Sequence, residues 1–218
     1  MAETTKVYHY TRLEDWPSIK RGSYKSDHKP GLGPSRGLGT VDPQAFKTYA
    51  VFALTDPTPE NWTSNPHFPR IWDHLRANIG LMLLEVDVDP TTDKSVYVVD
   101  RGHMEGFLYQ DKDGIPPQYL HPTRREAEHA YLESKVPFSD FLSGKYDYSL
   151  PEVIFEGRVP IEKISVPPQQ PFLSTELTDS YNDYVRDFLW RVENTPELKP
   201  FTVKNKAIID RAKQQSEK

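Results

Sequence analysis

Glu152 is the most informative titratable residue of the sequence. It follows Leu150 and Pro151 and opens the apolar run Val153–Phe155, so its carboxylate enters a strand that the pattern predicts to be buried. Burying a carboxylate is costly unless other groups compensate its charge. Glu152 is therefore a candidate for a functional anion, and the alternative is a charge at a sheet edge or one half of an ion pair.

His9 is the second candidate. It lies in the strand-like segment Lys6–Thr11, with a tyrosine on either side. Side chains alternate across a strand, so His9 faces the core if Val7 does. In that position it either orients a ligand through a hydrogen bond or is a buried histidine whose ring bonds to the backbone.

A polar stretch, Val98–Gly106, directly follows a predicted strand and offers further candidates. Its charged and titratable residues are Asp100, Arg101, His103 and Glu105. This concentration of charged residues directly after a strand favours a solvated hairpin. The alternative is contact with a substrate.

Metal and cysteine chemistry have no support in the residue pattern. The sequence contains none of the common phosphate-loop, dinucleotide, zinc-protease or serine-hydrolase motifs. Its seven histidines form no recognisable pair of ligands, and the absence of cysteine excludes thiolate ligands and cysteine nucleophiles. We therefore expect no metal site.

Short strands and helices must position these residues, and they follow one another irregularly. Strands are predicted over Lys6–Thr11, Tyr49–Leu54, Gly80–Val88, Ser95–Val99, Glu152–Phe155 and Lys163–Val166. Helices are predicted over Arg12–Arg21, Pro69–Asn78, Thr123–Ser134 and Leu177–Val192, with a charged helix or frayed tail over Lys204–Lys218. The glycine- and proline-rich interval Ser23–Thr48 reads as a long loop. This order predicts an α+β fold rather than a doubly wound parallel sheet.

The helix Thr123–Ser134 has the clearest signals. Thr123 and Glu126 have the spacing of a capping box, and Ala127, Ala130 and Tyr131 form an apolar stripe. We expect that stripe to pack in the core.

Composition limits the possible partners. The chain has 218 residues and a net charge of −5, which argues against non-specific binding to nucleic acid and favours protein or small-molecule partners. The longest apolar run, near Ile79–Leu84, is far shorter than the roughly 20 residues of a membrane span. We expect a cytoplasmic protein with no membrane partner.

Three segments together resemble the ADP-ribosyltransferase superfamily. They are YHYT (Tyr8–Thr11), the helical pattern L-x5-I-K-x-G (Leu13–Gly22) and PEVIFEGRVPIEKI (Pro151–Ile164). The likeness is to the branch whose first strand carries histidine, which includes poly(ADP-ribose) polymerases and polymorphic ADP-ribosylating toxins. The late segment is similar to the DNA-modifying toxins of the DarT family. The resemblance spans Val7–Val166 and implies a split, mostly antiparallel sheet with peripheral helices and an NAD cleft between its halves.

The resemblance also implies roles for individual residues. Glu152 would bond to the nicotinamide ribose and stabilise the cationic transition state as nicotinamide leaves, and it would be the catalytic residue. His9 would hold the adenosine ribose, with Tyr10 and Thr11 framing the same side. His9 and Glu152 would then line one cleft on adjacent strands.

Two further elements of the NAD site are implied less directly. A tyrosine on the middle strand stacks on nicotinamide in this superfamily, and the matching segment here offers Tyr49 or Phe52, with core aromatics as the alternative. Arg36 lies in the glycine-rich stretch Gly31–Gly39, and its guanidinium suits a pyrophosphate. The alternative for Arg36 is a solvated loop arginine.

The sequence therefore predicts a transferase domain over residues 1–172 and a helical extension over 173–218. NAD would be the substrate, without a metal, and ADP-ribose would pass to an unidentified acceptor or to water. The competing interpretation is a catalytically silent module that binds a nucleotide or a protein on the same scaffold.

Overall fold

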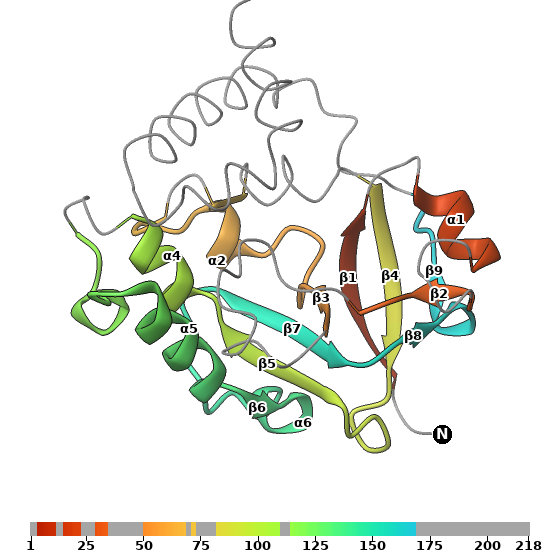
Figure 1. Ribbon diagram of the computed structural model, residues 1–218. Helices are drawn as coiled ribbons and strands as arrows, with labels where there is room; N and C mark the ends of the chain where they lie inside the picture. The colour runs from red at the N-terminus through yellow and green to blue at the C-terminus, as the bar shows by residue number, and fades with distance from the viewer. Residues whose placement is uncertain are drawn as a thin grey trace, which may run out of the picture.

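Antiparallel sheets form the framework of the protein (Figure 1). The computed structural model describes residues 4–11, 15–22, 29–34, 50–68, 71–72, 82–109 and 114–168. In this part of the chain one sheet has the order β1-β4-β9 and a second has the order β3-β7-β5-β6, and β2 pairs with β8. Every pairing is antiparallel. The expectation of an α+β protein built on antiparallel sheets is confirmed.

The strands are short. Their bounds are β1 (Thr5–Thr11), β2 (Gly31–Leu32), β3 (Ala50–Ala53), β4 (Met82–Val88), β5 (Val96–Asp100), β6 (Val136–Pro137), β7 (Pro151–Glu156), β8 (Val159–Pro160) and β9 (Ile164–Ser165). The helices are α1 (Trp16–Arg21), α2 (Glu60–Thr63), α4 (Gly102–Leu108), α5 (Arg124–Glu133) and α6 (Phe138–Phe141), with 3-10 turns η2 (Pro117–Tyr119) and η3 (Ile161–Lys163). No helix within the described ranges is long and apolar enough to cross a membrane.

In the described residues, one backbone bridge joins the two larger sheets. The N–H of Tyr8 donates to the carbonyl of Leu54 at 2.9 Å, and the N–H of Leu54 donates to the carbonyl of Tyr8 at 2.7 Å. Beyond this pair no further ladder between β1 and β3 is formed in the described residues. The sheet is therefore split at the strand that carries His9.

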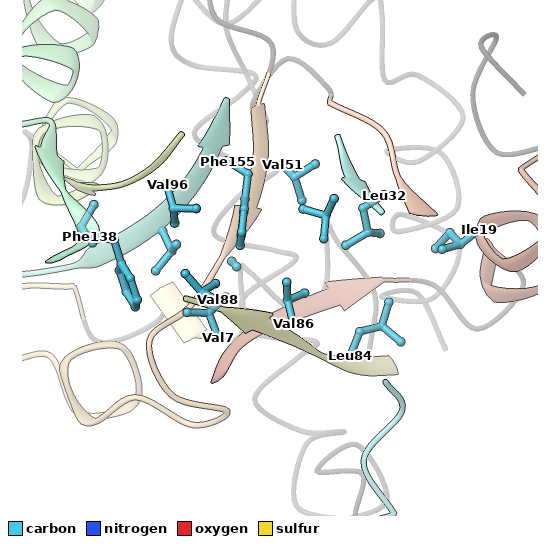
Figure 2. Packing of buried hydrophobic residues seen from close by; sticks show 14 of the residues in the cluster. Val7, Ile19, Leu32, Val51, Leu84, Val86, Val88, Val96, Phe138 and Phe155 are labelled. Atoms are coloured by element: carbon cyan, nitrogen blue, oxygen red, sulfur yellow. The ribbon is translucent and has the colours of Figure 1, made fainter. Parts of the chain in front are cut away.

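A shared hydrophobic core holds the two sheets together. Val7 on β1 and Val86 on β4 are fully buried, and they pack in one cluster with Val51 on β3 and Val153 on β7 (Figure 2). Alternation along each strand directs these apolar side chains to one face. Because apolar burial is the main stabilising contribution to folding, this core fixes the strands on either side of the split.

Helices α4 and α5 cover the opposite face of the sheet that contains β5 and β7 (Figure 1). Tyr131 of α5 and Met104 of α4 pack against Ile154 of β7. The predicted capping box is confirmed, because Thr123 accepts from the Glu126 N–H and the Glu126 side chain accepts from the Thr123 N–H.

The expected hairpin over Val98–Gly106 is wrong, because β5 continues into helix α4. A Cβ added at Gly106 would lie 2.1 Å from the carbonyl oxygen of Tyr119, so the glycine permits a close approach of η2 that any larger residue would block. Glycine at this position therefore allows tight packing of α4 against η2.

Other sequence predictions differ in detail. The interval Ser23–Thr48 contains the two-residue strand β2, and the short helix α2 was not predicted. Helix α1 ends as expected at Gly22, whose φ of 82° is the left-handed conformation of a C-terminal cap. Most of Pro69–Asn78 and the whole extension 173–218 lie outside the described residues.

Candidate functional site

Glu152 lies near the start of β7 on the face that α4 and α5 cover. It pairs with Val99 of β5, and only 3% of its surface is exposed. The indole N–H of Trp62 donates to the carbonyl of the preceding Pro151 at 3.1 Å and so anchors this end of the strand from α2. The carboxylate is thus carried by a strand that both β5 and α2 hold in place.

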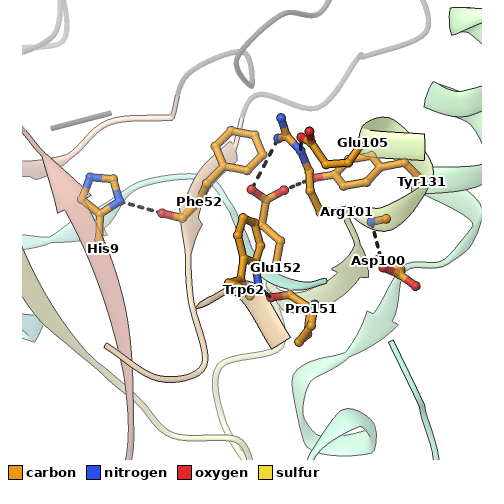
Figure 3. Close-up of polar contacts among 10 residues, drawn as sticks. His9, Phe52, Trp62, Asp100, Arg101, Glu105, Tyr131, Pro151 and Glu152 are labelled. Carbon is orange, nitrogen blue, oxygen red and sulfur yellow. Dashed lines mark hydrogen bonds and ion pairs between the residues drawn. The ribbon is translucent and has the colours of Figure 1, made fainter. Parts of the chain in front are cut away.

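Among the described residues, two side chains contact the Glu152 carboxylate (Figure 3). The Tyr131 hydroxyl donates to Oε2 at 2.6 Å, and Nη1 of Arg101 lies 3.6 Å from Oε1. The first contact is a short hydrogen bond, whereas the second is an ion pair too long for one. Oε1 is therefore the oxygen that is left to accept a hydrogen bond from a hydroxyl group of a ligand.

Arg101 is shared between two carboxylates. Its Nε donates to Oε1 of Glu105 at 2.9 Å, while Nη1 makes the longer contact with Glu152. Burial lowers the pKa of Arg101, but the charges of Glu152 and Glu105 outweigh burial, so the net shift is upward. The guanidinium stays positively charged.

Burial raises the pKa of Glu152. The charge of Arg101 and the hydrogen bond from Tyr131 oppose this shift, and the charge of Glu105 adds to it. The net direction is upward, because desolvation disfavours the charged form more than these partners favour it. Such a perturbed group is typical of functional sites, although structural ion-pair networks have it too.

A second ion pair extends this network along α5. Nε of Arg124 donates to Oε1 of Glu128 at 2.9 Å, and both residues are buried. Oε2 of Glu105 and Oε2 of Glu128 are buried without a hydrogen-bond partner among the described residues. With Glu152, three glutamates face two arginines here, so the fully ionised cluster carries one excess negative charge.

His9 lies at the split between the sheets. Its Nδ1 is 2.6 Å from the carbonyl oxygen of Phe52 on β3, so the ring donates a hydrogen bond there (Figure 3). Burial lowers the pKa of His9 and favours the neutral ring. A neutral imidazole that donates through Nδ1 presents Nε2 as an acceptor. The ring of His9 is thus bonded to the backbone through Nδ1, as one of the two interpretations from the sequence expected.

The neighbours of His9 point into the protein. The Tyr10 hydroxyl donates to the carbonyl of Pro57 at 2.6 Å, and its ring packs edge-on against Trp72 at 5.6 Å. Tyr10 is only 3% exposed, as is Thr11. Tyr10 belongs to a hydrophobic cluster rather than to the polar group around Glu152.

Phe52 lies between His9 and Glu152 (Figure 3). Its strand, β3, pairs with β7, and within the described residues β3 forms no ladder with β1. The expectation that His9 and Glu152 occupy adjacent strands is therefore wrong. Phe52 is half-buried on the strand between them, while Arg36 and Tyr49 lie outside the described residues.

Sequence reasoning did not assign Arg101, Glu105 or Tyr131 to the site. Arg101 and Glu105 were expected in a solvated hairpin, and Tyr131 in a core stripe. The spacing of Arg101 and Glu105, which is i to i+4, signals an ion pair on a helix once α4 is recognised. Within the described ranges no group of three or more possible ligands could hold a metal ion.

Comparisons of the chain with protein-family models, curated proteins and solved structures found no match. The site's own geometry must therefore carry any functional conclusion.

Proposed function

We propose that the protein is an NAD-dependent ADP-ribosyltransferase with Glu152 as its catalytic residue. The observation that carries this proposal is the buried Glu152 carboxylate, which is held by Tyr131 through one oxygen and leaves the other for a substrate hydroxyl. The split between the two sheets at His9 is the further feature that fits the resemblance to this superfamily.

The proposed reaction needs an anion and no redox partner. The bond between C1′ of the ribose and the nicotinamide nitrogen breaks, and its electron pair neutralises the positively charged nicotinamide ring. The cation that develops on the ribose is stabilised by the Glu152 carboxylate. An acceptor nucleophile then bonds to C1′ and releases its proton to solvent.

The remaining residues would bind NAD. Oε1 of Glu152 would accept a hydrogen bond from the 2′-hydroxyl of the nicotinamide ribose. Nε2 of His9 would accept a hydrogen bond from a hydroxyl of the adenosine ribose. The half-buried ring of Phe52, which lies between these two residues, would stack on nicotinamide. NAD would then extend from β1, which holds the adenosine ribose, across β3 to β7, which holds the nicotinamide ribose.

The test is nicotinamide release from NAD by the Glu152→Gln variant. The amide keeps the shape of the side chain and can still accept from Tyr131, so we expect NAD affinity and the fold to survive. Loss of the charge should slow turnover about 100- to 1000-fold, because only the transition state needs it. Chromatography of nicotinamide and calorimetry of NAD binding measure the two effects separately.

A matched control lies on the same strand. Glu156 is at the other end of β7, where its carboxylate forms a 2.6 Å ion pair with Lys135. Glu156→Gln should turn over NAD at the wild-type rate. Equal turnover by the Glu152→Gln variant would contradict the proposal, and free ADP-ribose as the only product would make the protein a glycohydrolase.

A silent binding module is the second candidate. The 3% exposure of Glu152 favours it, because a carboxylate so covered and already paired resembles a structural ion pair. Binding of NAD by the wild-type protein without any release of nicotinamide, with or without acceptors, would support this alternative.

A further inference from the structure

We propose that Arg101 is a positioning residue that supplies the countercharge of Glu152, and that Glu105 weakens this effect by competing for the same guanidinium. The catalytic consequence rests on the proposed function, whereas the electrostatic part concerns only this chain and can be tested without NAD.

Geometry shows that the guanidinium is shared unequally. Arg101 stands between the end of β5 and the start of α4, which directs its side chain between Glu105 of α4 and Glu152 of β7 (Figure 3). Glu105 holds Nε in a 2.9 Å hydrogen bond, and Glu152 has only the 3.6 Å contact with Nη1. Removal of Glu105 would therefore leave Arg101 wholly to Glu152.

The groups around Glu152 leave no substitute for this charge in the described residues. Helix α5 contributes the Tyr131 hydroxyl, which is neutral, and the pair Arg124–Glu128, whose members bond to each other. The neighbouring strand β3 and helix α2 contribute uncharged aromatic side chains, Phe52 and Trp62. Arg101 is the cation in direct contact with Glu152.

Two substitutions should therefore act in opposite directions. Arg101→Met removes the cation but keeps an apolar side chain of similar length, so Glu152 should hold its proton to higher pH. Glu105→Gln removes the competing anion, so Glu152 should lose its proton at lower pH. The opposite signs follow from the opposite charges of Arg101 and Glu105, and they test whether both groups act on Glu152.

Carbon-13 NMR of protein labelled at the glutamate side-chain carboxyl tests this directly. The signal that disappears in Glu152→Gln identifies Glu152, and its titration midpoint is then measured in each variant. We expect an upward shift of about 1–3 pH units in Arg101→Met, the size expected for loss of a close opposite charge, and a downward shift in Glu105→Gln. Arg125→Gln, an exposed arginine on α5, should leave the midpoint unchanged.

The Arg101→Lys variant keeps the charge and serves as the second substitution should Arg101→Met not fold. Its midpoint should lie close to that of the wild type. An unchanged midpoint in folded Arg101→Met, or a Glu105→Gln midpoint that stays or moves upward, would overturn the inference.

The pH dependence of nicotinamide release should shift in the same directions as the titration midpoint of Glu152. The acidic limb of its pH profile should move upward in Arg101→Met and downward in Glu105→Gln. If the wild-type protein releases no nicotinamide, the proposed function fails while the NMR titration still decides the role of Arg101. If activity is present but the midpoints do not move apart, only the inference about Arg101 fails.

Discussion

Two buried carboxylates lie on neighbouring strands, and they are held very differently. Asp100, at the end of β5, accepts through Oδ1 from the N–H groups of Gly102 (2.9 Å) and Leu150 (3.1 Å). Its Oδ2 accepts from the Tyr119 hydroxyl (2.7 Å) and the Ser149 N–H (3.2 Å). Asp100 is thus saturated by four donors that join three segments of the chain.

Glu152 pairs with Val99 on β5, next to Asp100. Its carboxylate accepts one hydrogen bond from Tyr131 and makes one long ion pair with Arg101. The two carboxylates are equally buried, at 3% exposure each. Burial alone therefore does not distinguish a structural acid from a candidate catalytic one. The number and rigidity of the hydrogen-bond donors around each carboxylate distinguish the two acids. A saturated carboxylate has no lone pair left for a substrate.

The largest effect is expected from Asp100→Asn. The amide nitrogen would face two N–H or O–H donors, so two hydrogen bonds to a charged acceptor are lost, at about 1.5–3 kcal/mol each. We expect the free energy of unfolding to fall by about 3–6 kcal/mol in urea denaturation. A fall of the same size in Glu152→Gln would remove the distinction between the two residues.

Tyr131→Phe should have the next largest effect. It removes the hydroxyl that donates to Oε2 of Glu152 and keeps the ring that packs on Ile154. The expected loss is about 1.5–3 kcal/mol in the free energy of unfolding, measured with the same denaturant. An unchanged stability would mean that this hydrogen bond does not hold Glu152.

The pH dependence of the free energy of unfolding should reveal the buried Glu152 carboxylate. Because burial raises the pKa of Glu152 above its ordinary value of 4.5, the folded state binds its proton more tightly than the unfolded state. The stability from this group is fully present below pH 4.5 and is lost as the pH rises through the folded pKa. Wild type should therefore lose stability relative to Glu152→Gln, by at most about 1.4 kcal/mol per pH unit.

Denaturation of both proteins in parallel across this pH range measures the difference directly. Comparing the two removes the opposite contribution of His9, His103 and His121, whose pKa values burial lowers. A difference that grows in favour of the wild type as the pH rises would contradict the assigned direction.

The smallest effect is expected at the other side of the split. His9→Ala removes the ring that donates to the Phe52 carbonyl. In the proposed NAD site this variant loses the contact of Nε2 with the adenosine ribose and keeps the Glu152 carboxylate. We expect NAD affinity to fall about tenfold in calorimetry, which is about 1.4 kcal/mol. A large fall in kcat with unchanged affinity would instead give His9 a role in the chemical step.

Local patterns in the sequence were sufficient for most strands and for the best helix. β-branched and aromatic residues predicted β1, and a continuous apolar run that ends in alternation predicted β4. The spacing of Thr123 and Glu126 predicted the start of α5. These features depend on residues within a few positions of one another. The sequence also singled out Glu152, because a charge at the head of an apolar strand is unusual.

What the sequence did not show is the surroundings of that charge. Glu105 and Tyr131 come from the helices α4 and α5, and Arg101 directly precedes α4. The segment Val98–Gly106, which contains α4, was expected to be a solvated hairpin. Gly106 is a glycine because η2 packs against it, which is a contact between segments distant from each other. Only the tertiary structure brings Asp100 and Glu152 to neighbouring strands and decides which carboxylate keeps an acceptor lone pair for a substrate. Hydrogen-bond saturation and desolvation depend on neighbours that no local spacing encodes.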